Sequence, residues 1–212
     1  MMINQIVEDA RGQSRHGSCG VGFGETLARH EDSPCRLTVA DLCTPDLPEK
    51  LGRIRDHWLP VRLEQFGIYA LSAEWRRRIR SDVVLEGFIS CAQEMLDRSV
   101  VTGNDYLQRC RSLVFEGAQG LLLDQSHVWF PHVTRSNTGL QNVVELATEA
   151  GIDGLDVIYA TRAYLTRHGA GPLPFELSEK PYARIFDATN TPHPYQGQLR
   201  FAPLNFDLLK KS

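Results

Sequence analysis

One amide side chain, Gln119, lies in a turn of small residues with the sequence Gly-Ala-Gln-Gly. The turn follows an apolar stretch over residues 112–116, which we interpret as a buried strand. Glycines at a strand end let the backbone approach a ligand closely. Thr134 begins a polar loop rich in Thr, Ser and Asn fifteen residues further on. An amide donor followed by hydroxyl-bearing residues makes this stretch the main candidate for ligand binding.

A glycine-rich loop over residues 16–26 is the second candidate. Its Gly-x-Gly spacing does not follow a buried strand, so it does not predict a dinucleotide site. The sequence contains no Gly-Lys-Ser/Thr, so it has no P-loop signature. Taken alone the loop favours a structural role, with an anion-binding nest of backbone N–H groups as the alternative.

Composition sets outer limits on the function. The chain has 212 residues, of which 42% are hydrophobic and 23% charged, as in a soluble globular protein. Its net charge of −3 gives no general attraction to nucleic acid or to an anionic membrane. No apolar run is long enough to span a membrane, and no signal peptide is evident at the first residues. We therefore expect neither nucleic acid nor membrane as a partner.

The five cysteines are odd in number and scattered, without CxxC spacing. This pattern argues against a disulfide framework and favours a reducing, cytoplasmic compartment. A zinc site among the cysteines and histidines of residues 16–43 would need paired short spacings, which are absent. We expect no metal site there.

Two further features have ordinary explanations. The arginine run over residues 76–80 lies near Asp82 and Glu86 and is typical of a solvated helix face. Glu116 stands beside a turn glycine and is either a general base or, more commonly at a strand end, a hydrogen-bond anchor for the loop.

The hydrophobic patterns alternate between strands and helices, which predicts an α/β fold. We expect one domain over residues 1–212, with a central, largely parallel sheet, helices on both faces and a helical block at 44–100 in which Pro60 breaks or kinks a helix. A further helix is predicted at 139–150. Strands are predicted at 1–12 (a stub), 112–116, 155–165, 183–188 and 198–202; residues 37–42 fit a short strand or a helix edge.

Three sequence blocks, at residues 10–24, 115–138 and 164–174, resemble adenylosuccinate synthetase. The middle block is similar to the family's Phe-Glu-Gly-Ala-Gln-Gly…Leu-Leu-Asp…Pro-x-Val-Thr-Ser-Ser-Asn-Thr without a gap. The third is similar to Tyr-x-Thr-Arg-Val-Gly-x-Gly-Pro-Phe-Pro. The C-terminal part looks closer to the short archaeal and phage members. The resemblance implies a core related to P-loop NTPases.

The resemblance also implies a reaction and roles for named residues. In the family GTP phosphorylates the 6-oxygen of IMP, and aspartate then displaces the phosphate in the presence of Mg²⁺. Gln119 would donate a hydrogen bond to the 6-oxygen. The 5′-phosphate would be bound by Thr134 and by backbone N–H groups of Ser18, Cys19 and Gly20, where Cys19 replaces a threonine. Further candidates are Arg29 or Arg36, reaching the phosphate across a dimer interface, and Arg200, on the aspartate side.

Departures from the family pattern are equally specific. The Gly-Asp-Glu-Gly-Lys-Gly-Lys loop, the catalytic aspartate and histidine, the Mg²⁺ ligands and the guanine-recognition segment have no counterpart here. Gln198 stands where an arginine for aspartate is expected. Met1 and Met2 align inside a family strand, which favours a start at an internal methionine.

These departures lead us to expect an incomplete, truncated ligase whose GTP and Mg²⁺ sites lie outside this chain and which needs a partner or a missing N-terminal segment. IMP is the expected ligand, with dGMP as the alternative, and the chain is expected to form a homodimer or to bind a complementary chain. The other hypotheses are a non-catalytic purine-nucleotide-binding or interaction protein derived from the family, and a degenerate gene product without a pocket.

Overall fold

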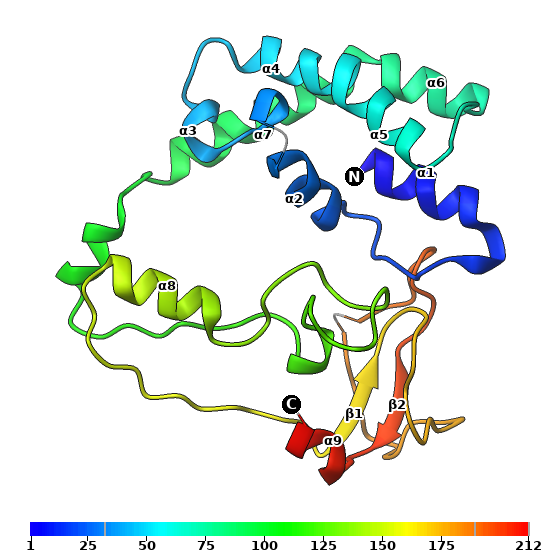
Figure 1. Ribbon diagram of the computed structural model, residues 1–212, viewed down its shortest axis with the longest axis vertical. Coiled ribbons are helices and arrows are strands. Elements are labelled where there is room, and N and C mark those ends of the chain that lie inside the picture. The colour runs from blue at the N-terminus through cyan, green and yellow to red at the C-terminus, as the bar shows by residue number, and fades with distance from the viewer. Residues whose placement is uncertain (32, 189, 212) are drawn as a thin grey trace. The chain divides into compact units, whose positions relative to one another are not determined.

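The computed structural model describes residues 1–31, 33–188 and 190–211 (Figure 1). The chain divides into two compact units. The first consists of Met1–Gln13 and Gly20–Thr102, and the second of Ser14–Cys19 and Gly103–Ser212. The predicted helical block at 44–100 falls within the first unit.

The described residues of the first unit are helical wherever they are regular. The predicted strand stub at the N-terminus is wrong, because Met2–Arg11 forms helix α1. Ile3, Ile6 and Val7 recur at helical spacing and are buried, which a strand of period two would not allow. The other helices are α2 (Phe23–Glu31), α3 (Val39–Leu42), α4 (Leu47–Arg53), α5 (Leu59–Gln65), α6 (Ala73–Arg80) and α7 (Asp82–Arg98), with 3₁₀ turns at Gly12–Ser14 and Ser33–Cys35.

The core of the first unit is built from α1 and α5. The buried side chains of α1 pack with Trp58, Leu59 and Leu63. A smaller cluster joins Leu47 and Leu51 of α4 to Ala92 of α7. The predicted helical block at 44–100 is helical over most of its length, but Val83, Val84, Phe88 and Met95 of α7 are exposed, so much of that helix's apolar surface is not packed.

Pro60 distorts the helix that contains it, as predicted. Residues Ile54–Trp58 form a π-helical segment, η3, that joins α4 to α5. Proline has no N–H and its ring crowds the carbonyl of the preceding turn, so a regular α-helical ladder cannot pass through this point. The chain is widened there and continues as α5.

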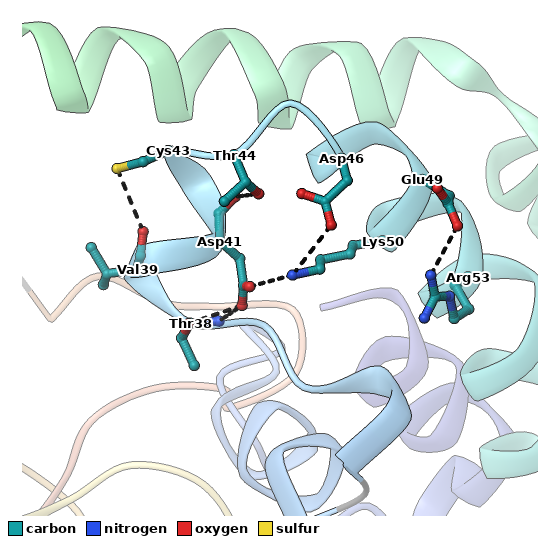
Figure 2. Close-up of polar contacts among 9 residues, drawn as sticks. All are labelled: Thr38, Val39, Asp41, Cys43, Thr44, Asp46, Glu49, Lys50 and Arg53. Carbon is teal, nitrogen blue, oxygen red and sulfur yellow. Dashed lines mark hydrogen bonds and ion pairs between the residues drawn. The ribbon is translucent and has the colours of Figure 1, made fainter.

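Thr38 and Asp41 form a capping box at the start of α3. The Asp41 carboxylate accepts hydrogen bonds from the Thr38 backbone N–H at 2.6 Å and from its hydroxyl at 2.9 Å. Lys50 of α4 donates to the same carboxylate and lies 3.6 Å from Asp46 (Figure 2). Hydrogen bonds from Lys50 and then Thr38 lower the pKa of Asp41 to about 2. This network fixes α3 against α4, so the alternative of a helix edge at 37–42 is correct.

In the described part of the second unit the one sheet is a pair of antiparallel strands, β1 (Tyr164–Arg167) and β2 (Arg200–Pro203). Tyr164 pairs with Pro203, and Arg167 with Arg200. The helices of this unit are α8 (Gln141–Glu149) and α9 (Phe206–Lys211), with 3₁₀ turns at Asn104–Arg109 and Leu121–Leu123. The predicted helix at 139–150 is confirmed as α8, which ends before Gly151 at φ 65°.

Most of the other predicted strands are not formed in the described residues. Residues 112–116, 155–163 and 183–188 belong to no strand, and the predicted central, largely parallel sheet is not present there. Figure 1 draws the trace that follows α8 as an elongated segment leading to β1. Val114 and Ile158 on these segments are 92% and 89% exposed. A strand needs a second backbone to accept and donate its hydrogen bonds, and an apolar pattern alone cannot supply one.

The predicted strand at 198–202 corresponds to β2, which begins two residues later and ends one residue later. Between the predicted strands at 183–188 and 198–202, the described residues 190–197 are loop apart from an isolated bridge between His193 and Gly197. Among the helices that the structure describes, none combines the length and apolar character needed to cross a membrane.

Candidate functional site

Gln119 has a backbone conformation that its residue type rarely adopts. Its φ is 64°, in the left-handed region, although the position is not glycine. Such a conformation costs on the order of 1 kcal/mol and is retained where the surroundings determine it, often at binding sites. The side chain is exposed. The structure thus places the predicted amide at a strained turn, a feature that the sequence did not reveal.

Backbone hydrogen bonds tie the chain that follows Gln119 to the Thr134 loop. The N–H of Thr134 donates to the carbonyl of Leu123 at 2.8 Å, and the N–H of Gln125 donates to the carbonyl of Ser136 at 3.0 Å. Only three residues separate Gln119 from Leu123 along the chain. The Thr134 loop is therefore bonded to the segment that begins four positions after Gln119.

Asp124 holds this local structure together. Its carboxylate accepts hydrogen bonds from the Ser126 hydroxyl at 2.6 Å, the Ser126 N–H at 3.0 Å and the Thr138 N–H at 2.8 Å. Hydrogen bonds from Ser126 and then Thr138 lower the pKa of Asp124. Sequence reasoning did not select Asp124 as a site residue. Its position in the Leu-Leu-Leu-Asp run, which is similar to the family's Leu-Leu-Asp, is the signal that was available.

The turn containing Ser18 and Cys19 packs against the loop that follows β1. A Cβ atom on Gly17 would lie 2.5 Å from the backbone N of Ala170, and one on Gly169 would lie 2.4 Å from the Gly17 carbonyl oxygen. The His16 and His132 rings also meet edge to face at a centroid distance of 5.5 Å. These contacts connect the residue 16–19 turn with two loops that are more than 100 residues away in sequence.

Arg200 forms hydrogen bonds with the same loop. Its Nη1 donates to the carbonyls of Gly169 and Gly171, both at 2.9 Å, and its Nε donates to Glu176 at 2.8 Å. The hydrogen bond to Glu176 raises the pKa of Arg200. The structure thus gives Arg200 contacts within the protein that hold residues 169–176 in place. Its proposed part in ligand binding stays a prediction.

Three buried polar atoms on these loops have no hydrogen-bond partner among the described residues. They are His132 Nδ1, Thr138 Oγ1 and His168 Nδ1. Buried polar atoms are rarely left unbonded, and a small set of them on adjoining loops is typical of a place where a ligand or water binds.

The remaining candidates belong to the first unit. Gly20 is buried and has φ 74°, a conformation suited to glycine. Arg29 lies on α2, where burial lowers its pKa. Arg36 is exposed and its Nε donates to the carbonyl of His30 at 3.0 Å. Their proposed roles at a phosphate, across a dimer interface for the two arginines, stay predictions.

The described residues contain no group of three or more His, Cys, Asp or Glu side chains arranged to hold a metal ion.

Comparison with known proteins identifies the family. The family model for adenylosuccinate synthetase matches residues 1–195. The adenylosuccinate synthetase of Alkalilimnicola ehrlichii is 36% identical over 187 residues, covering 84% of this chain and 40% of that protein. That of Nostoc punctiforme is 33% identical over 181 residues, covering 83% and 38%, and that of Bordetella avium 33% identical over 189 residues, covering 86% and 41%.

The chain thus spans about two fifths of the length of these curated relatives. The matched region contains all the loops described above, from the residue 16–19 turn to the loop after β1. The chain belongs to the adenylosuccinate synthetase family, whose members have an α/β nucleotide-binding fold.

Proposed function

We propose that this chain binds a purine nucleoside monophosphate, IMP, and forms part of a ligase that joins IMP to L-aspartate with GTP hydrolysis. The observation that carries the proposal is the backbone hydrogen bond from Thr134 to Leu123, four positions after Gln119 in the chain. A strained amide and a hydroxyl loop are joined through Leu123 and held by Asp124. A neutral amide suits an oxygen that becomes negative, because it donates a hydrogen bond without losing a proton.

In this proposal the Gln119 amide donates to the 6-oxygen of the purine. Thr134 binds the 5′-phosphate through its hydroxyl, and the Ser18–Cys19 turn adds backbone N–H donors. The packing of Gly17 on Gly169 supports a rigid turn, which is what anion binding by backbone groups requires. The aspartate-binding role of Arg200 follows the family resemblance, and the Glu176 pairing would have to loosen for it.

Phosphoryl transfer would require groups that this chain does not carry. The sequence has no counterpart of the family's Gly-Asp-Glu-Gly-Lys-Gly-Lys loop, and the described residues contain no group of three or more side chains arranged to hold a metal ion. Positioning and charge neutralisation supply most of the catalysis in phosphoryl transfer. We therefore propose that GTP and Mg²⁺ bind to a polypeptide that completes the enzyme, either a partner chain or a further segment.

The same polypeptide would complete the central sheet. Residues 112–116 and 155–163 are exposed apolar segments outside any strand. We propose that both become strands of a largely parallel sheet when neighbouring strands are supplied. Apolar residues on both faces of these segments support this reading, since parallel strands are usually covered on both sides.

A second candidate function is purine-nucleotide binding without catalysis. The two candidates make the same prediction for IMP and differ in whether a complementary polypeptide restores ligation.

Calorimetry on the purified chain tests the binding site. We expect IMP to bind with a Kd of about 1 mM or tighter, and GTP not to bind. Gln119→Ala and Thr134→Val should each weaken IMP binding about 5- to 30-fold, the range for loss of one or two hydrogen bonds. Gln141→Ala and Thr148→Val on exposed positions of α8 are the matched controls. Parallel titration with dGMP decides between the two monophosphates. Tight GTP binding without a response to IMP or dGMP would reverse the assignment.

A further inference from the structure

Arg167, the last residue of β1, is a buried cation without a counter-charge. Only 7% of the surface of Arg167 is exposed to solvent. Among the described residues no carboxylate pairs with it, and the one charged neighbour that affects it is another cation, Arg200. Burial and then Arg200 lower the pKa of Arg167. An unpaired buried charge is destabilising, so a fold that keeps one must gain something from its contacts.

The contacts of Arg167 join two loops. Its Nη2 donates to the carbonyl of His132, and its Nε and Nη2 both reach the carbonyl of Ala170 at 3.5 Å. The guanidinium also lies over the Trp129 ring, with Cζ 5.4 Å from the ring centroid. The planar fork thus bonds carbonyls from the residue 129–134 loop and from the loop after β1 at the same time, which a single ammonium group does less well.

Both loops lead directly to residues proposed to bind phosphate. His132 is two residues before Thr134, whose N–H is bonded to Leu123. The backbone N of Ala170 packs closely on Gly17, the residue before Ser18. Gly171 packs against the same contacts, so a side chain does not fit there. A Cβ atom on Gly171 would lie 2.4 Å from Arg167 Nη2 and 2.6 Å from the Cβ of His132.

We infer that Arg167 is a positioning residue for the nucleotide phosphate: its fork sets the spacing between the Thr134 loop and the Ser18–Cys19 turn. The inference rests on the proposed function. This role differs from direct attraction of the phosphate by a positive charge. It requires the fork geometry and the two carbonyl contacts of Arg167 rather than its charge alone.

Calorimetry with IMP on the full chain separates these roles. We expect Arg167→Met to weaken IMP binding at least about 10-fold and Arg167→Lys to weaken it nearly as much, since lysine keeps the charge and loses the fork. Arg162→Met is the control, because Arg162 is a half-exposed arginine close by in the chain, and it should change binding less than about 2-fold. Full binding by Arg167→Lys would show that charge, and not geometry, is what matters.

A second variant disturbs the fork while leaving the arginine in place. Gly171→Ala should weaken IMP binding in the same way as Arg167→Met. Gly197→Ala is its control, because Gly197 also has a positive φ, of 71°, but a Cβ atom there would meet nothing within 4 Å. Equal IMP binding by the two alanine variants would overturn the inference, and this comparison remains available if Arg167→Met fails to fold.

A spectroscopic readout distinguishes positioning from a general loss of structure. With fluorinated tryptophan, the ¹⁹F resonance of Trp129, assigned with Trp129→Phe, should move on IMP addition in the wild type. In Arg167→Met it should already be displaced without ligand, while the resonances of Trp58 and Trp75 in the first unit stay unchanged. Exchange of the Thr134 N–H should also become faster in Arg167→Met, with or without ligand.

The outcomes separate the two proposals. If the wild type binds neither IMP nor dGMP but Thr134 exchange rises in Arg167→Met, the proposed function fails while the contact that Arg167 makes is real, and the inferred role in phosphate binding falls with the function. If the wild type binds IMP and Arg167→Met binds it within about 2-fold with an unchanged Trp129 resonance, the proposed function stands and the inference on Arg167 is overturned.

Discussion

Gly17 and Gly169 pack backbone against backbone, so closely that a Cβ atom on Gly169 would lie 2.4 Å from the Gly17 carbonyl oxygen. No residue other than glycine fits at such a contact without movement of the chain. The contact joins the turn that precedes Ser18 to the loop that follows β1. It explains why a glycine-rich turn without a preceding strand has a defined conformation here.

Gly169→Ala should therefore destabilise the second unit. Overpacking against backbone, together with the strain at φ 73°, predicts a loss of about 2–3 kcal/mol in the free energy of unfolding. Gly197→Ala has almost the same φ, 71°, without a neighbour, and should cost only about 1 kcal/mol. Urea denaturation followed by circular dichroism measures both. Equal losses for the two variants would mean that the Gly17 contact contributes nothing.

Replacing Gln119 by glycine should stabilise the chain and reduce IMP binding. Glycine adopts φ 64° without strain, so the free energy of unfolding should rise by about 1 kcal/mol. The same change removes the amide proposed to contact the purine. Gln119→Ala removes the amide and keeps the strain, so it should lose binding without gaining stability. Thermal melts and calorimetry on both variants test the pair, and a less stable Gln119→Gly would show that the turn is not strained.

Loss of the Asp124 carboxylate should loosen the Thr134 loop. In Asp124→Asn we expect weaker hydrogen bonds from Ser126 and Thr138, faster amide exchange at residues 134–138 and weaker IMP binding. The pKa of Asp124 is lowered in the folded chain, so its contribution is present above the unfolded carboxylate pKa of about 3.9 and is lost as pH falls through the lower folded value. The stability difference between wild type and Asp124→Asn should accordingly shrink below about pH 4. A constant difference down to pH 2 would contradict this.

The Asp41 network predicts a second, independent pH effect, in the first unit. Since the folded pKa is about 2, the stabilisation from Asp41 is complete above the unfolded pKa of about 3.9 and disappears as pH falls towards 2. Asp41→Asn should lower the melting temperature at pH 7 and have little effect near pH 2. Glu49→Gln, which removes an exposed ion pair with Arg53 on the same helix, is the control and should change little at either pH.

Exposed apolar residues on segments 112–116 and 155–163 should affect binding of a complementary polypeptide but not the stability of the isolated chain. Val114→Asp and Ile158→Lys are expected to leave the stability of the isolated chain within about 0.5 kcal/mol, because both side chains are almost fully exposed. Each should block binding of a polypeptide that carries the family's remaining length, measured by co-purification and by ligase activity of the mixture. Normal assembly of both variants would remove the support for sheet completion.

The helices of the 44–100 block and α8 could be predicted because their signals are local, whereas α1, α2 and α9 were not predicted. Thr38 lies three residues before Asp41, and Pro60 distorts the turn that precedes it. At residues 1–12 the prediction of a strand failed. The buried side chains of this segment follow helical spacing, but the segment is too short for that period to stand out in the sequence.

Strand pairing could not be predicted, because it depends on backbones that are distant in sequence. The apolar pattern at 155–165 extends over the whole segment, yet only Tyr164–Arg167 finds a partner, β2. Residues 112–116 have a comparable pattern and no partner among the described residues. The apolar pattern indicates which side chains a segment can bury. Strand pairing also requires a second backbone with which to form hydrogen bonds.

Within the candidate site, the sequence by itself determined the family, the motif residues and the chemistry they offer, because these depend on residue type and short spacing. Only the tertiary structure showed that Gln119 sits at a strained φ, that Asp124 holds the Thr134 loop, and that Arg167 joins two loops without a counter-ion. The physical reason is that burial, strain and loop-to-loop hydrogen bonds are properties of groups brought together by folding, such as Gly17 and Gly169, and no local pattern encodes them.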